Sequence, residues 1–231
     1  PRSGGYDYVE LYNRTNKVID LNRLMLANVD NQHQIKDFYG IGNTPLLIFP
    51  KEQIALTENV KNIRANYYSA YPERILQVNT LPGMSDDEGT ILIMGSVGKR
   101  LDQLDYSVEW HHPQVDNKDG VSLERISYEL PTQDKNNWTS AAATAGYGTP
   151  GQVNSQFNTL NSNDRTIHLL KDVFSPDGDG YDDELLIQYN MGETGYICSF
   201  SVFTSQGNLV KKVLNNELLG SSGQLKWRGE T

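Results

Sequence analysis

The chain has 231 residues, a formal net charge of -9 and an isoelectric point near 4.9. Its lysines and arginines are scattered, so the acidic field repels phosphate backbones and excludes nucleic acid as an expected partner. Thirteen Tyr, 20 Gly and 9 Pro favour short strands joined by turns, which predicts an all-β fold. No apolar run approaches the roughly 20 residues that span a bilayer, so we expect no transmembrane segment in this sequence.

Candidate strands follow one another through the first half of the chain. Side chains alternate over residues 6–12, and a second strand is expected over residues 18–26 with a bend near Asp20. The short segments 46–49 and 53–56 flank a turn at Pro50, which predicts a hairpin. Further strands are expected at residues 90–94, 101–107 and 122–128.

One short helix is expected in this half, over residues 58–68. Val60, Ile63 and Tyr67 repeat at helical spacing, and Thr57 is a candidate N-cap.

The second half begins after a polar stretch. Residues 146–164 carry Gly, Pro, Asn, Ser and Gln with almost nothing apolar, a composition typical of a linker. We therefore expect two β-sandwich domains, at residues 1–155 and 166–231, joined by a linker at 156–165. Five short strands are expected in the second domain, at residues 166–173, 183–189, 197–204, 209–214 and 224–227.

Four separated segments of the first half resemble bacterial lamin-tail domains. Residues 8–13, followed by 18–26, resemble the opening strand of that family and its aspartate-leucine step. Residues 101–106 resemble its later strand. The closing signature is matched by residues 120–125, Asn137-Trp138, residues 148–151 and Asn154.

The second half resembles immunoglobulin-like modules of secreted Bacteroidetes-type and flagellar-hook-capping proteins. Residues 174–183 resemble the opening motif of these modules, and residues 203–210 resemble their next hairpin. Residues 227–229 resemble a tryptophan-aspartate-glycine turn, in which Arg228 replaces the usual aspartate. The two resemblances imply immunoglobulin-like sandwiches, with a further strand before the first and further strands after the second. Edge strands left open in this way invite added strands, although strands that lie outside these 231 residues are the favoured explanation of both edges.

The acidic loop of residues 177–183 is the candidate metal site. Asp177, Asp179 and Asp183 lie in a glycine-bent loop, where carboxylates can converge on Ca²⁺. The spacing does not match an EF-hand. In the alternative interpretation, the Asp side chains simply bind local backbone amides in consecutive turns. Both interpretations stay open at this point.

Other reactive residue types fit structural roles. His111 and His112 are adjacent on an extended segment and point apart, so we expect a turn and not a zinc site. Cys198 lies in an alternating strand and is expected in the core. Glu10 and Arg125, on the strands that resemble the lamin-tail family, are hypothesised to be structural anchors, and a pairing between them is one arrangement of such anchors.

Two functions remain open. The first is a non-catalytic binding or spacer module of an exported bacterial protein, adhesive in character, with a protein or glycan partner at the cell surface. The second is an accessory part of a secreted or periplasmic hydrolase, of nuclease or phosphatase type, whose catalytic domain lies outside these residues. In both, the chain is not itself an enzyme and Ca²⁺ is its only candidate cofactor. The resemblance implies an extracellular, cell-surface or periplasmic location, and the sequence predicts no oligomeric state.

Overall fold

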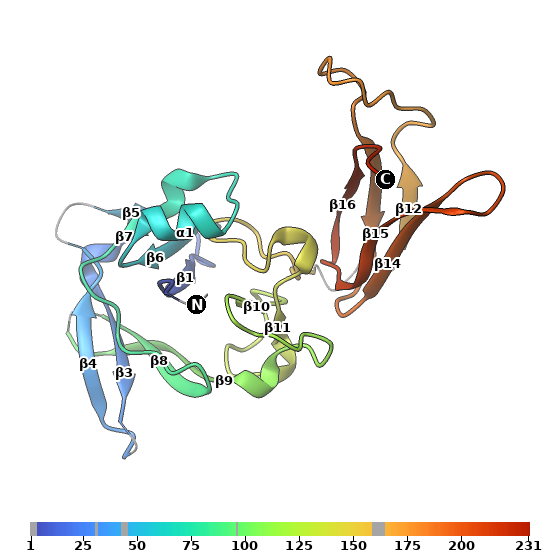
Figure 1. The fold of residues 1–231 in the computed structure, drawn as a ribbon. Coiled ribbons are helices and arrows are strands. Elements are labelled where there is room, and N and C mark those ends of the chain that lie inside the picture. The colour runs from blue at the N-terminus through green and yellow to red at the C-terminus, as the bar shows by residue number, and fades with distance from the viewer. Residues whose placement is uncertain (1–3, 31, 43–45, 96, 159–164) are drawn as a thin grey trace.

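The computed structural model describes residues 4–30, 32–42, 46–95, 97–158 and 165–231. The chain folds mostly into β-strands, as the composition predicts (Figure 1). Within the described residues, no helix is long and apolar enough to cross a membrane.

Two sheets face each other in the first half. A three-stranded sheet has the order β1-β6-β7, with strands at Tyr8–Tyr12, Gln53–Thr57 and Ile75–Gln77. A four-stranded sheet has the order β4-β3-β8-β9, with strands at Ile35–Gly40, Leu24–Val29, Glu88–Gly95 and Arg100–Ser107. Leu11 and Leu56 from the first sheet pack in one cluster with Leu26 and Ile91 from the second. This cluster is the core of a sandwich.

Smaller elements complete the first half. The helix α1 (Val60–Asn66) buries Ile63 against the three-stranded sheet. Two-stranded sheets form between β2 (Ile19–Asp20) and β5 (Leu47–Ile48), and between β10 (Leu123–Arg125) and β11 (Trp138–Ser140). Five 3-10 turns lie at Leu21–Arg23, Pro72–Arg74, Val108–Trp110, Lys135–Asn137 and Ala143–Ala145.

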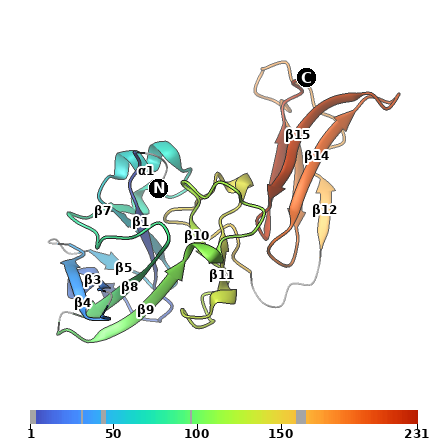
Figure 2. The same cartoon turned by 60° about the horizontal axis from the view of Figure 1, so that its bottom comes forward.

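The second half contains the five expected strands. They form a sheet of order β12-β13-β16 and a hairpin β14-β15, at Thr166–Leu169, Leu185–Asn190, Ser222–Trp227, Ile197–Phe203 and Leu209–Leu218. Three of them, β12, β14 and β15, are labelled in Figure 2. Tyr189 and Leu225 from the sheet pack with Cys198 and Phe200 from the hairpin. The two layers therefore share one core.

Several local predictions are wrong in detail. The segments 46–49 and 53–56 do not pair with each other, because β5 pairs with β2 and β6 pairs with β1. The cap of α1 is Asn59, whose side chain accepts from the Asn62 amide, while Thr57 belongs to β6. The strand expected over residues 122–128 is limited to β10.

The polar segment 146–158 is packed, although its composition is typical of a linker. Gln156 is completely buried and donates a 3.0 Å hydrogen bond to the Leu219 carbonyl. The Ser221 amide donates to the Ser155 carbonyl at 2.9 Å, and the Asn158 side chain donates to the Gly192 carbonyl at 2.5 Å. This part of the chain thus joins the two halves through hydrogen bonds and burial. Residues 159–164, also expected in the linker, lie outside the described residues.

Candidate functional site

A groove with a volume of about 540 Å³ runs along β1. Every residue from Tyr6 to Arg14 contributes to its lining, so the groove follows the length of the strand. The opposite wall comes from β9, the segment 120–125 and Trp138. Ligand-binding sites commonly have volumes of about 300 to 1,000 Å³, so this groove is large enough to be one.

The side chains of β1 divide the groove into an apolar side and a polar side. Val9 and Leu11 pack into the core between the sheets. Tyr8, Glu10 and Tyr12 point the opposite way because successive strand residues alternate between faces. A ligand beside β1 therefore meets apolar and polar surface on its two flanks.

Aromatic rings line the polar side. The Tyr8 hydroxyl lies 2.5 Å from the Ser122 hydroxyl. Tyr12 stacks on Tyr128 with ring centroids 4.1 Å apart, and Tyr128 stacks on Phe157 at 4.6 Å. Burial raises the pKa of the Tyr8 and Tyr128 phenols, which keeps both protonated as hydrogen-bonding groups.

Glu10 is a partly buried carboxyl in the lining of the groove. Its Oε1 accepts a 2.9 Å hydrogen bond from the Gly151 backbone amide. Burial raises the pKa of Glu10 well above its usual value, and the nearby Glu124 carboxyl raises it further, whereas the Gly151 hydrogen bond lowers it. The hypothesis that Glu10 anchors the fold agrees with this contact between β1 and a segment distant in sequence.

Glu124 is a buried carboxyl, and the sequence reasoning missed it. It accepts from the Thr149 hydroxyl at 2.5 Å, the Ser155 hydroxyl at 2.7 Å and the Gln156 amide at 3.0 Å. Burial raises its pKa, and these hydrogen bonds oppose that rise. Glu124 and Arg125 are neighbours in a strand, so one of them has to face inward, and this alternation was the available signal. Glu124 holds the segment 149–156 in place.

Arg125 contacts backbone carbonyls and not Glu10. Its Nε donates to the Ser127 carbonyl at 3.1 Å, and its Nη2 donates to the Leu130 carbonyl. Arg125 thus closes the turn after β10, where it also lines the groove. The expected anchor role agrees with these contacts, and the arrangement in which it pairs with Glu10 does not.

The histidine pair forms a structural contact. His111 Nδ1 lies 2.8 Å from the Ser140 hydroxyl, and the His112 amide donates to the same hydroxyl at 3.0 Å. Burial lowers the pKa of His111 to about 4, so its ring stays neutral near pH 7. Ser140 is completely buried, so its hydroxyl is inaccessible to a substrate. This serine and histidine serve the fold.

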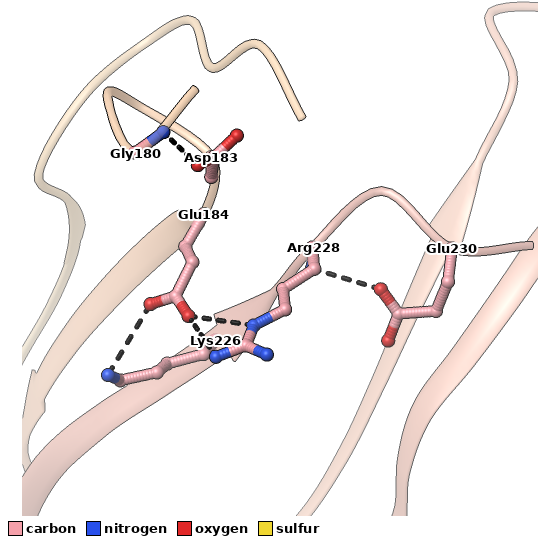
Figure 3. Close-up of polar contacts among 6 residues, drawn as sticks. All are labelled: Gly180, Asp183, Glu184, Lys226, Arg228 and Glu230. Atoms are coloured by element: carbon pink, nitrogen blue, oxygen red, sulfur yellow. Dashed lines mark hydrogen bonds and ion pairs between the residues drawn. The ribbon is translucent and has the colours of Figure 1, made fainter. Parts of the chain in front are cut away.

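The acidic loop brings together the three expected carboxylates. Asp177, Asp179 and Asp183 each offer an oxygen within 4.8 Å of the others, and no other group of three His, Cys, Asp or Glu side chains in the described part of the chain does so. Asp183 accepts from the Gly178 amide at 2.7 Å. It also accepts from the Gly180 amide at 2.8 Å (Figure 3). The loop therefore forms the amide contacts of the turn interpretation and also brings the three carboxylates within 4.8 Å of one another.

The turn at Arg228 is closed without the aspartate that the resemblance implies. The Arg228 amide donates to a Glu230 carboxylate oxygen at 3.0 Å, and the Trp227 indole donates to the Glu230 carbonyl at 3.0 Å. The Arg228 side chain binds Glu184 at 2.7 Å, and Lys226 lies 3.4 Å from the same carboxylate (Figure 3). Hydrogen bonds from these two cations lower the pKa of Glu184.

Cys198 is partly buried against the core of the second half. Burial raises the pKa of its thiol, which disfavours the nucleophilic thiolate. The prediction that Cys198 is a core residue thus holds for its packing, although its burial is incomplete.

Comparisons with known proteins add no relative to this description. No protein-family model matches the chain, and no curated protein matches it either.

Proposed function

We propose that the chain is a non-catalytic binding and spacer module of an exported bacterial cell-surface protein. The groove along β1 binds a protein or glycan ligand, and the second half holds this binding surface away from its attachment point. The groove is the observation that carries the proposal, because it combines apolar surface, aromatic rings and a few polar groups, as ligand-binding sites do. The surface location rests on the resemblance of the two halves to exported modules.

The polar groups around the groove support binding more than catalysis. The Tyr8 hydroxyl contacts Ser122, the Glu10 carboxyl accepts from the Gly151 amide, and Ser140 is buried beside His111. A hydrolytic site needs a nucleophile and a base that both reach the substrate. Here the one serine-histidine contact described has a hydroxyl that solvent does not reach.

The junction between the halves supports the spacer role. Gln156, Ser155 and Asn158 are hydrogen-bonded to residues of the second half. Tyr147 also donates to a Glu217 carboxylate oxygen at 3.2 Å. A packed junction of this kind transmits a set orientation, whereas a flexible polar linker does not.

The acidic loop supports a second, independent proposal. We propose that Asp177, Asp179 and Asp183 bind Ca²⁺, with further oxygens from backbone carbonyls and water. The amide contacts of Asp183 shape the loop before the ion binds, and carboxylate oxygens keep lone pairs for a metal. The ion then stabilises the second half and takes no part in chemistry.

Binding in the groove is tested by NMR titration of the isotopically labelled chain. The probes are a panel of soluble oligosaccharides and nonapeptides selected on the chain from a random library. A ligand of either kind is expected to shift the NMR signals of residues in β1 and β9. Leu101→Trp, at an exposed groove residue, is expected to weaken binding, whereas Ile167→Trp, at an exposed residue of β12, is the matched control. The proposal would be contradicted if Leu101→Trp left the affinity of the ligands unchanged. It would also be contradicted if neither panel contained a ligand.

A further inference from the structure

We propose that the groove accepts an extended peptide as an additional β-strand on the open edge of β1. The peptide alternates apolar and polar side chains, and a lysine or arginine on it faces Glu10. This inference rests on the proposed function and specifies the class of ligand.

The open edge of β1 is the first observation. Among the described strands, β1 is hydrogen-bonded only to β6 and forms the end of its sheet. The Asn13 amide donates to the Glu52 carbonyl at 3.0 Å, which places Asn13 in a hydrogen-bonded pair with β6. Hydrogen bonding alternates along an antiparallel pair, so the amides and carbonyls of Tyr8, Glu10 and Tyr12 point to the opposite edge. These groups are available to a strand in the groove.

The groove has the shape of a strand site. Its lining includes nine consecutive residues, from Tyr6 to Arg14, so it borders the backbone and not only a few side chains. The five residues of β1 extend about 17 Å at the usual rise of a strand. An oligosaccharide is recognised mainly through ring faces and hydroxyls, and it does not use a row of alternating backbone donors and acceptors. A peptide strand does use them.

The two flanks of β1 set the pattern of the peptide. A strand added to a sheet places its side chains on the same two faces as its neighbour. One face adjoins Val9 and Leu11 and takes apolar side chains. The other adjoins Tyr8, Glu10 and Tyr12 and takes polar ones.

The negative charge of the groove favours a lysine or arginine side chain on the peptide. Carboxylates outnumber guanidinium groups in the lining, and Arg125 is already engaged with backbone carbonyls. The net charge of the chain, -9, also favours a basic partner. Glu10 lies at the middle of β1, so the cation belongs at the centre of the peptide. The acidic groups of the lining are Asp7, Glu10, Asp86 and Asp102.

A designed peptide tests this arrangement on the chain of 231 residues. The probe is acetyl-Ser-Val-Thr-Val-Lys-Val-Thr-Val-Ser-amide. Two analogues carry N-methyl groups on alternate residues, one on the odd-numbered positions of the peptide and the other on the even-numbered positions. A third analogue has norleucine in place of lysine. Affinity is measured by calorimetry, and amide hydrogen exchange is followed by NMR.

Strand addition predicts that the unmodified peptide binds and protects the amides of Tyr8, Glu10 and Tyr12 from exchange. One N-methylated analogue is expected to bind at least about tenfold more weakly, because it loses several edge hydrogen bonds, and the other is expected to bind nearly as well as the parent. Norleucine is expected to weaken binding several-fold in the wild type, where the lysine ammonium favours the ionised form of Glu10, and not in Glu10→Gln, which cannot ionise.

Equal affinities of the two N-methylated analogues, or absence of binding by the parent peptide, would overturn strand addition. The proposed function survives that result if an oligosaccharide or another peptide still binds the groove in a manner sensitive to Leu101→Trp. Concentration-dependent dimers that protect the same three amides without peptide would identify a second copy of the chain as the occupant and also overturn the inference.

Discussion

Glu10 and Gly151 are 141 residues apart in sequence and are joined by a hydrogen bond of 2.9 Å. Glu10 belongs to the strand that lines the groove, and Gly151 belongs to the packed segment that leads to the second half. The binding surface and the junction therefore share an anchor. Changes at Glu10 are expected to affect stability as well as binding.

Glu10→Gln is expected to make the chain more stable at neutral pH. Burial raises the pKa of Glu10 in the folded state, so this state binds more protons than the unfolded state above the usual carboxyl pKa of 4.5. The contribution of Glu10 to the free energy of unfolding is thus largest below pH 4.5 and falls as the pH rises. Gln keeps an oxygen for the Gly151 amide without the ionisable proton, and a gain of about 1 to 3 kcal/mol is expected at pH 7. Urea unfolding from pH 4 to pH 8 measures the difference, and a variant that is less stable at every pH would contradict this account.

Glu124→Ala is expected to destabilise the chain by roughly 3 to 5 kcal/mol. The substitution leaves the donors of Thr149, Ser155 and Gln156 without their acceptor in a buried site. Glu124→Gln is expected to cost less, because it keeps one acceptor oxygen and the volume of the side chain. Denaturant midpoints compare the two variants, and a Glu124→Ala midpoint equal to that of the wild type would show that these bonds are dispensable.

Gly220→Ala is expected to disturb the junction between the halves. A Cβ atom at this position would lie 2.6 Å from the Ser155 carbonyl oxygen, which accepts from the Ser221 amide. The backbone has to shift, at a cost on the order of 1 to 3 kcal/mol. Gly40→Ala is the control, because a Cβ atom there meets nothing within 4 Å. Thermal unfolding and limited proteolysis at the junction compare the variants, and equal behaviour of the two would refute the packed junction.

Millimolar Ca²⁺ is expected to raise the melting temperature of the wild-type chain relative to a chelator. An ion present at ten times its dissociation constant stabilises the folded state by about 1.4 kcal/mol. A chain of this size then melts roughly 3 to 6 °C higher. Asp179→Asn removes one of the three converging carboxylates and is expected to abolish most of the shift. A melting temperature unaffected by Ca²⁺ would leave the loop as a set of turns.

The sequence predicted elements whose pattern is local. Alternation located β1, the bend at Asp20 located the 3-10 turn before β3, and helical spacing located α1. The strand β4 escaped detection because most of its residues are exposed and give no burial pattern. The strand β11 was missed as well, and Trp138, part of the closing signature of the lamin-tail resemblance, begins it.

Features that depend on distant partners did not follow from the sequence. A turn at Pro50 suggested that its flanking segments pair with each other, but β6 pairs with β1 and β7 instead. Polar composition suggested a linker around Gln156, which is instead buried with a hydrogen-bonded side-chain amide. The acidic loop was identified in full because its three carboxylates are close in sequence. The groove was not, because its opposite wall comes from segments about 90 to 130 residues after β1.

The open edge of β1 is tested most directly by amide hydrogen exchange on the unliganded chain. The amides of Val9 and Leu11 bond to β6 and are expected to exchange slowly, whereas those of Tyr8, Glu10 and Tyr12 face the groove and are expected to exchange quickly. This alternation requires no knowledge of the ligand. Uniform slow exchange across all five residues would contradict the account, because it would mean that both edges of β1 are already paired.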